Sequence, residues 1–290
     1  MTLRIDAALV DVDLRSVGDR ARSIEALWYD GAFTFEGPHD PFLPLALAAA
    51  TTSRIEVTTA VAIAFARSPM TLAHTARDLN DLAEGRAILG LGSQVRAHVE
   101  RRFSMPWSHP AARMREYIQA LHAIWGSWRD GTPLRFEGEF YRHTLMTPFF
   151  SPGPNPYGPP KIHLAAVGEL MTKVAGEVAD GIIIHGFTTE RYVKEVTIPA
   201  VEAGLAAAGR DRASFEVSGP LFVVTGTTEE EMAAAERGVK QQIAFYGSTP
   251  AYRGVLELHG WGDLQTELNT LSKQGKWVEM GELIDEDRKS

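Results

Sequence analysis

The sequence predicts an α/β protein built as a (β/α)8 TIM barrel, on three observations. Short apolar, β-branched segments alternate with longer helical segments seven times along the chain, with no break in composition. The strand segments are continuously apolar rather than alternating, as expected of parallel strands whose outer face is covered by helices. The length of 290 residues suits one large barrel. A doubly wound open sheet is the competing architecture, and it would need a reversal of strand order that the pattern does not show.

The first half of the chain supplies four strand–helix units. The expected strands are 3–10, 31–36, 55–64 and 85–92. The expected helices, with apolar residues three and four positions apart, are 17–29, 44–52, 69–82 and 111–128. For the helix at 69–82, Ser68 suits the N-cap and Pro69 suits the first helical position.

The second half begins irregularly and then resumes the same rhythm. Residues 133–160 are rich in proline and aromatic residues and too apolar for a solvated tether, so we expect an irregular excursion between the fourth and fifth strands. The later strands are 161–166, 181–185 and 215–225. The later helices are 169–179, 189–208 and one that begins at 227–231 with acidic residues in its first turn.

An eighth strand is not evident in the sequence. Beyond 227–231 the pattern shows helices and turns only. A parallel barrel without its eighth strand would expose unpaired backbone groups at the gap. We therefore expect 1–290 to be a single barrel domain that is incomplete at its C-terminus. The alternatives are an open or plugged barrel, and a partner that supplies the missing piece.

Composition narrows the classes of function. The net charge of −8 argues against a protein that binds nucleic acid, because such proteins need a basic face. The absence of cysteine excludes disulfides, thiol nucleophiles and zinc–thiolate sites. The nine histidines form no metal-binding motif, so we expect no metal. The chain shows no signal peptide and no apolar run long enough for a bilayer, so we expect a cytoplasmic protein without membrane contact.

In a parallel barrel the chemistry lies where the strands end, so the residues after each strand are candidates. The second strand is followed by Glu36, His39 and Asp40, and an imidazole between two acids can transfer protons. The alternative is a polar loop made of turn-forming residues. The sixth strand brings His185 to the same rim, as a ligand-binding residue or as a hydrogen-bonded structural one.

Two further strand ends offer places for an anionic ligand. The fourth strand ends in glycines that admit a ligand close to the backbone, followed by the polar Ser93 and Gln94. The basic residues that follow could receive an anion or form a solvated helix face, and they are Arg96, Arg101 and Arg102. After the fifth strand, Val167 and Gly168 lead directly into a helix, whose free N–H groups could hold a phosphate. The alternative is an ordinary strand-to-helix turn, and the neighbouring Glu169 would repel a phosphate if it pointed inward.

Several of these residues belong to an ordered set of short motifs. The set is Glu36…Asp40-Pro-Phe42, Arg67-Ser-Pro69, Gly85-Arg86, Gly90-Leu-Gly-Ser-Gln94 and Ala175…Ala179-Asp-Gly181. In this order the motifs resemble the bacterial luciferase-like monooxygenase superfamily, and within it the F420-dependent oxidoreductases. The segment 245–253 resembles a signature of one deazaflavin-linked subgroup. The resemblance runs from residue 1 to about residue 284.

The resemblance implies a barrel with an excursion between the fourth and fifth strands and a tricyclic ring in its mouth. It also implies a non-prolyl cis peptide bond between Ala60 and Val61 that supports the face of the ring. The remaining positions that match cofactor contacts are Ser93 and Gln94 for the ring or its ribityl chain, and Val167 and Gly168 for the phosphate.

Two departures limit what the resemblance implies. The sugar-phosphate dehydrogenases of this family have aspartate followed directly by histidine after the second strand, whereas here Gly37 separates Glu36 from the histidine at position 39. Their glutamate after the fourth strand is replaced by Gln94 and Val95. A neutral glutamine cannot act as a general acid, so the alcohol-oxidising mechanism of those enzymes is not expected here.

We expect an oxidoreductase that transfers a hydride between coenzyme F420 and a small organic molecule. His39 is the candidate acid or base, and Glu36 would orient it or bind the edge of the ring. The three arginines after the fourth strand would bind the anionic tail of the cofactor. The alternatives are an FMN-dependent monooxygenase and a non-catalytic barrel that binds flavin or deazaflavin. We also expect a homodimer.

Overall fold

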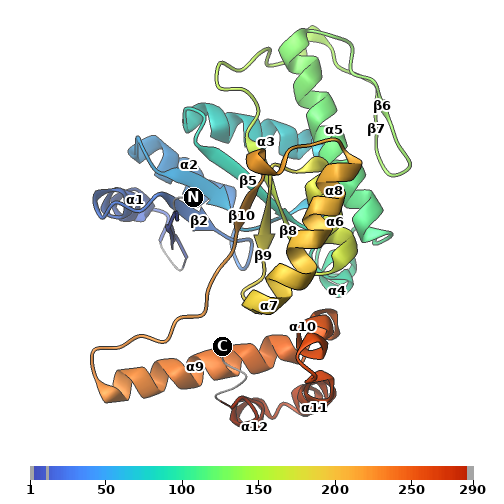
Figure 1. Cartoon of the computed structure of the whole chain (residues 1–290). Helices are drawn as coiled ribbons and strands as arrows, with labels where there is room; N and C mark the ends of the chain where they lie inside the picture. Colours follow the sequence, from blue (N-terminus) through green and yellow to red (C-terminus); the bar gives the residue numbers. More distant parts are fainter. Residues whose placement is uncertain (1–2, 11–12, 286–290) are drawn as a thin grey trace.

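The computed structural model describes residues 3–10 and 13–285. Its main sheet is parallel and curls into a half-barrel with the strand order β1-β2-β3-β5-β8-β9-β10, in which the short β4 also pairs with β5 (Figure 1). The strands are β1 Asp6–Ala8, β2 Gly31–Thr34, β3 Glu56–Thr59, β4 Ala62–Ile63, β5 Ala87–Gly92, β8 Lys161–Ala166, β9 Gly181–Ile184 and β10 Glu216–Ser218. The predicted α/β barrel architecture is confirmed.

Helices cover the outer face of this sheet and enclose its main apolar core. They are α1 Val17–Ala26, α2 Phe42–Thr51, α3 Pro69–Leu82, α5 Pro110–Asp130, α6 Glu169–Val178 and α8 Ile198–Ala207, with the short α4 Arg96–Arg101 and α7 Glu190–Tyr192 at the strand ends. The core between helices and strands contains fully buried Leu45, Leu72, Tyr117 and Ile162. Burial of such large apolar side chains is the main source of stability for the half-barrel.

Two local predictions along the helices are confirmed and one needs correction. The helix predicted at 69–82 has these bounds, and the hydroxyl of its N-cap Ser68 accepts a hydrogen bond from the Thr71 N–H at 3.1 Å. The helix predicted at 189–208 contains a π-helical turn, η3 Val193–Thr197, between α7 and α8. Pro199 follows this turn, and proline lacks the N–H that an uninterrupted α-helix would use there.

Three predicted strands are much shorter than expected. The segment 3–10 forms a strand only at Asp6–Ala8. The segment 55–64 is divided into β3 and β4, and the predicted cis peptide bond between Ala60 and Val61 lies at the division. The segment 215–225 forms a strand only at Glu216–Ser218. The prediction was wrong beyond Ser218 because Pro220 has no N–H to donate to a neighbouring strand, and Leu221 beyond it is 82% exposed.

The excursion at 133–160 contains a small hairpin and one helical turn. The hairpin pairs β6 Phe136–Glu137 with β7 Arg142–His143, and the turn is η2 Pro148–Phe150. Glu116 of α5 holds the hairpin tip, because its carboxylate accepts hydrogen bonds from three consecutive backbone N–H groups at 2.5–2.9 Å, those of Glu139, Phe140 and Tyr141. Figure 1 shows the hairpin beside α5, away from the carboxyl ends of the strands.

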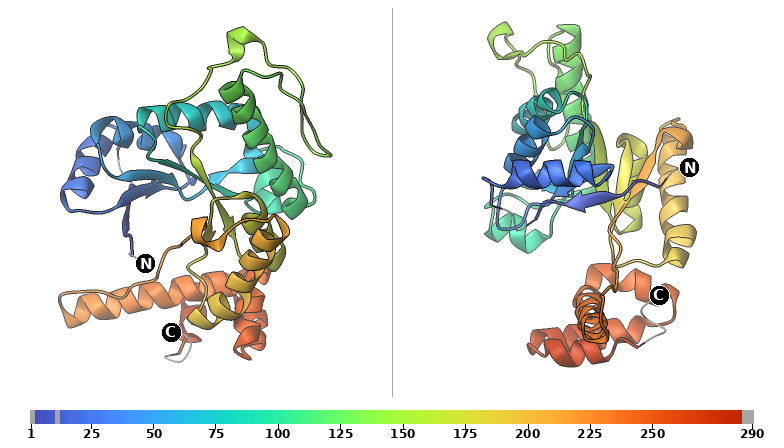
Figure 2. Two further views of the ribbon diagram at one scale, coloured as in Figure 1. Left: turned by 45° about the horizontal axis from the view of Figure 1, so that its top comes forward. Right: turned by 90° about the vertical axis from the view of Figure 1, so that its left-hand side faces the viewer.

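The chain after β10 forms a helical unit at the carboxyl end of β9 (Figure 2). It consists of α9 Glu229–Gly247, η5 Pro250–Tyr252, α10 Arg253–Leu258, α11 Gly262–Lys273 and α12 Trp277–Glu282. Thr228 caps α9 by accepting from the Glu231 N–H at 3.2 Å, as the acidic pattern at 227–231 predicts. A second apolar core joins this unit to Phe187 and Tyr192, which follow β9. The helices therefore cover the end of the sheet where β8 and β9 finish.

In the described part of the chain no eighth strand joins β10 to β1, so the half-barrel has a seam. Arg4, just before β1, spans the seam at its amino end, with hydrogen bonds to Glu56 at 3.0 Å and to Glu216 at 2.6 Å. The described residues include no helix that is long and apolar enough to cross a bilayer.

Candidate active site at the carboxyl ends of the strands

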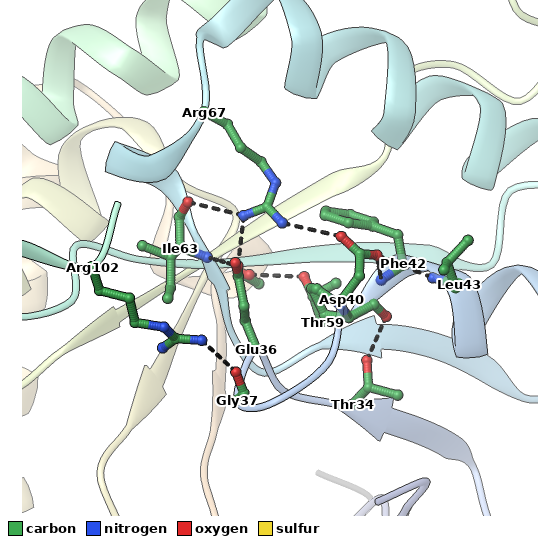
Figure 3. Close-up of polar contacts among 12 residues, drawn as sticks. Thr34, Glu36, Gly37, Asp40, Phe42, Leu43, Thr59, Ile63, Arg67 and Arg102 are labelled. Carbon is green, nitrogen blue, oxygen red and sulfur yellow. Dashed lines mark hydrogen bonds and ion pairs between the residues drawn. The ribbon is translucent and has the colours of Figure 1, made fainter. Parts of the chain in front are cut away.

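The segment after β2 is held by a network of charged side chains, drawn in Figure 3. The Glu36 carboxylate accepts hydrogen bonds from the Arg67 Nη1 at 2.6 Å and from the Ile63 N–H at 2.8 Å. The Arg67 Nη2 also reaches the Asp40 carboxylate at 3.2 Å. Only 7% of the Glu36 side chain is exposed. The arrangement makes Glu36 an ion-paired, positioning carboxylate with its Oε2 already occupied by two donors.

This network fixes a loop that carries His39. On one side of the loop, Arg102 donates to the backbone oxygen of Gly37 at 2.6 Å. On the other side, Asp40 stands just before the N-cap Pro41 and accepts from the first two N–H groups of α2, those of Phe42 and Leu43, at 2.8 and 3.3 Å. His39 lies exposed between these two anchors. Its imidazole is therefore carried by a fixed backbone and remains accessible to a molecule in solution.

The mouth of the half-barrel has an apolar floor where β4, β5 and β8 end. A Cβ atom added to Gly92 would lie 2.7 Å from the Cγ2 of Val61 and 3.9 Å from the Cβ of Ala165. Both side chains therefore border the space that a residue larger than glycine at position 92 would fill. Further down, a Cβ on Gly90 would lie 1.7 Å from the Thr59 oxygen, so only glycine fits where the two strands meet. Ala60 and Val61 are half-buried at this floor.

The loop after β5 holds two polar residues in place, but the three arginines predicted to bind an anion do not point to one common place. Gln94 has a positive φ of 61°, and its side chain turns back to accept from the Val95 N–H at 2.9 Å. The Ser93 hydroxyl donates to the backbone oxygen of Gln94 at 3.1 Å. Arg96 pairs with Glu100 of its own helix, Arg101 is exposed on the same helix, and Arg102 reaches the loop after β2.

The ends of β8 and β9 form a small pocket with His185 in its wall. Val167 lines the pocket and precedes Gly168, the N-cap of α6. The Phe187 N–H donates to the Nδ1 of His185 at 2.9 Å. Burial lowers the pKa of His185, so its imidazole is neutral near pH 7. Since Nδ1 accepts a hydrogen bond, the proton of the neutral ring lies on Nε2.

Tyrosines of the helical unit hold the His185 ring. Tyr252 stacks on it with the ring centres 4.6 Å apart, and Tyr246 meets it edge to face at 4.5 Å. Neither tyrosine was among the predicted site residues, although both lie in the recognised motif 245–253. Arg67 was also missed as a site residue, and its signal was the motif Arg67-Ser-Pro69. In each case the sequence motif indicated that the segment belongs to the site, and the fold shows which residue each of these side chains contacts.

The comparisons with known proteins agree with this architecture. The family of luciferase-like monooxygenases matches residues 4–289. This chain belongs to that family. An uncharacterized protein of Mycobacterium tuberculosis is 55% identical over 285 residues, which cover 98% of this chain and 84% of that protein.

Relatives with named activities are more distant. A 5,10-methylenetetrahydromethanopterin reductase of Archaeoglobus fulgidus is 27% identical over 217 residues, which cover 72% of this chain and 60% of that protein. The structure of the coenzyme F420-dependent tetrahydromethanopterin reductase of Methanopyrus kandleri matches 99% of this chain and 84% of that one, with a TM-score of 0.79 and 20% identity. At this identity the match establishes the fold. Both of these proteins are named as reductases.

Proposed function

We propose that this protein is an F420-dependent oxidoreductase that transfers a hydride between the deazaflavin and a small organic substrate. The observation that supports this most directly is the apolar floor of the mouth. Val61 and Ala165 both lie within 4 Å of the space that a side chain at position 92 would fill, and glycine leaves that space open. A flat tricyclic ring needs such a smooth apolar surface, with polar groups only at its edges.

The protein's own residues would bind and orient the two reactants. When bound, the deazaflavin supplies the hydride chemistry. Val61 and Gly92 would support the face of the ring, and the first turn of α6 after Gly168 would receive the phosphate. His39 would exchange a proton with the substrate, because its loop is anchored at Gly37 and Asp40 while its imidazole is exposed. Glu36 would act through Arg67 by holding this loop in place.

Titration of the protein with F420 and with FMN, followed by fluorescence, tests the cofactor. We expect saturable binding of F420. The variant Gly92→Ala places a methyl group on the floor and should weaken binding by about tenfold, a loss of roughly 1.4 kcal/mol. Gly238→Ala is the matched control, because a Cβ on this helical glycine meets nothing within 4 Å. Tight FMN binding without F420 binding would replace the proposal by a flavin-dependent monooxygenase.

Replacement of His39 tests the acid–base role. In His39→Ala the kcat of a reaction found with F420 should fall by about 10²–10⁴, while the Kd for F420 stays the same. His122→Ala removes an exposed histidine from the outside of α5 and serves as the control. An unchanged kcat in His39→Ala would leave His39 in a polar loop without a proton-transfer role. No turnover by the wild type over a broad panel of carbonyls and alcohols would favour a non-catalytic, cofactor-binding barrel.

A further inference from the structure

Arg102 connects two segments at the mouth that follow different strands. It is the C-cap residue of α4, in the segment after β5. Its Nη2 donates to the backbone oxygen of Gly37, in the segment after β2, at 2.6 Å (Figure 3). Among the described residues this is the one hydrogen bond between the two segments. The position of the loop after β2 therefore depends on a side chain that belongs to the other loop.

The backbone that carries Arg102 is itself well anchored. Val99 of α4 is fully buried in the main core, and its oxygen accepts a hydrogen bond from the Met105 N–H at 3.0 Å. The guanidinium lies over the Phe103 ring, 4.8 Å from the ring centre, which supports the side chain along its length. Arg102 is thus a fixed support for Gly37.

The charge of Arg102 is not paired with a carboxylate in the described part of the chain. Arg96 on the same helix pairs with Glu100 at 3.0 Å. The guanidinium of Arg102 contacts the Gly37 oxygen and the Phe103 ring instead. A hydrogen bond from a charged donor is stronger than one between neutral groups. The sequence predicted an anionic ligand for Arg102, whereas the structure gives it a backbone carbonyl.

The loop transmits this contact to His39 because its backbone has few free rotations. Its sequence is Gly37-Pro38-His39-Asp40-Pro41. Each proline ring fixes its own φ and restricts the residue before it to extended conformations. The oxygen that Arg102 holds belongs to the peptide bond between Gly37 and Pro38. It therefore fixes the peptide plane from which the histidine follows.

Other contacts hold the two ends of this loop from within its own segment. Beyond the histidine, the Thr34 hydroxyl donates to the Pro41 oxygen at 2.7 Å in a buried contact. Before the histidine, the Phe35 ring lies against Gly37, where an added Cβ would be 2.9 Å from the Cε2 of Phe35. Loss of the Arg102 contact would therefore release the near end of the loop while the far end stays attached.

We propose that Arg102 is a positioning residue for His39, which through the Gly37 oxygen couples the loop after β2 to the segment after β5. This inference rests on the proposed function, in which His39 exchanges a proton with the substrate. Proton transfer requires the two heavy atoms to lie within hydrogen-bond distance. A small displacement of the imidazole therefore lowers the rate of this step without weakening the binding of the cofactor.

A double-mutant cycle with His39 measures the coupling. Arg102→Met keeps an apolar stem beside Phe103 but removes the donor, and it should lower kcat with F420 by about tenfold. In a protein that already carries His39→Ala, the same substitution should lower kcat by less than about twofold, because the group that Arg102 positions is gone. Equal factors in the two backgrounds would overturn the inference.

Two further variants separate positioning from cofactor binding. Arg102→Lys keeps a charged N–H donor and should recover kcat to within about threefold of the wild type. Arg20→Met removes an exposed arginine of α1 and is the matched control. The Kd for F420 should stay within about twofold of the wild type in Arg102→Met. A Kd about tenfold weaker with an unchanged kcat would make Arg102 a ligand of the cofactor's anionic tail, and the inference would be wrong.

NMR relaxation of backbone amides adds a readout that needs neither cofactor nor substrate. The loop has amide N–H groups at Gly37, His39 and Asp40, since the two prolines have none. In Arg102→Met the order parameter at His39 should fall from about 0.85 to below about 0.6, with no change in Arg20→Met. An unchanged order parameter in Arg102→Met would contradict the inference.

The outcomes separate this inference from the proposed function. If the protein shows no turnover with F420, or if His39→Ala leaves kcat unchanged, the proposed role of His39 fails and the inference fails with it. If His39→Ala lowers kcat but Arg102→Met has the same effect in both backgrounds, the inference alone fails.

Discussion

The segment after β2 and the pocket beside α6 both lie at the carboxyl end of the sheet, yet the first contains paired charges and the second only neutral polar groups. After β2, an arginine and two carboxylates form a network in which Arg67 joins Glu36 and Asp40. Beside α6, the polar groups are a neutral imidazole and hydroxyls. The charged residues of the first region pair with one another, whereas the His185 imidazole of the second is held by a backbone N–H and two tyrosines.

This difference separates structural from functional polar groups. An ionised carboxylate that is nearly buried must have partners, and Glu36 has an arginine and a backbone N–H. Its role is to hold the loop of His39 against β4. The neutral, half-buried imidazole of His185 needs no charged partner, and one backbone N–H and two tyrosine rings hold it.

The largest effect that tests this contrast should come from Arg67→Met. The variant leaves the Glu36 carboxylate buried without its charged partner, which should lower the free energy of unfolding by about 3 kcal/mol. Urea denaturation followed by circular dichroism measures the loss. The double variant Arg67→Met/Glu36→Gln removes the unpaired charge and should recover a large part of it.

Arg96→Gln is the control for Arg67→Met. It removes an arginine from a pair with Glu100 on the surface, and its urea midpoint should stay near that of the wild type. If Arg67→Met unfolds at the same urea concentration as Arg96→Gln, the network after β2 is a surface feature and the contrast with the pocket disappears.

The sequence predicted the half-barrel well because its strands and helices follow from local patterns. The apolar run 161–166 and the capped helix 69–82 have the predicted bounds. The strand predicted at 215–225 was wrong over most of its length, since Pro220 removes a donor that a strand needs. The apolar residues after Pro220 give the same hydrophobic pattern in a strand and in an exposed segment. Hydrophobicity alone does not say whether a segment has a neighbour to pair with.

The site could be predicted only in part, because its residues meet through the fold. Glu36 and Arg67 were both present in short motifs, but their pairing depends on β2 lying beside β3. His185 and Tyr252 lie 67 residues apart and are brought together by the helical unit that follows β10. No local pattern reports such a contact, so the sequence could mark His185 as a rim residue without showing what fixes its ring.

A smaller effect is expected from Asp40, at the exposed edge of the network. From the position before the N-cap Pro41, its carboxylate accepts from the Phe42 and Leu43 N–H groups at the start of α2 and contacts Arg67 at 3.2 Å. Asp40→Ala should lower the free energy of unfolding by about 1 kcal/mol, the usual value of a helix cap. Asp40→Asn keeps an acceptor and should lose less. Equal losses in the two variants would show that the charge matters more than the cap.

The smallest effect concerns the pH dependence of stability, and it tests the neutral region. Burial holds the pKa of His185 below its ordinary value of 6.5, so the unfolded chain binds a proton that the folded chain does not take up. Stability should therefore fall as the pH decreases below about 6.5, and should be unaffected by this group above that value. The glutamine in His185→Gln does not titrate. When the pH is lowered from 7.5 to 5.5, the wild type should therefore lose more unfolding free energy than this variant does. A difference that stays constant over this range would mean that His185 accepts a proton in the folded protein as readily as in the unfolded chain, and the pocket would then not be a neutral one.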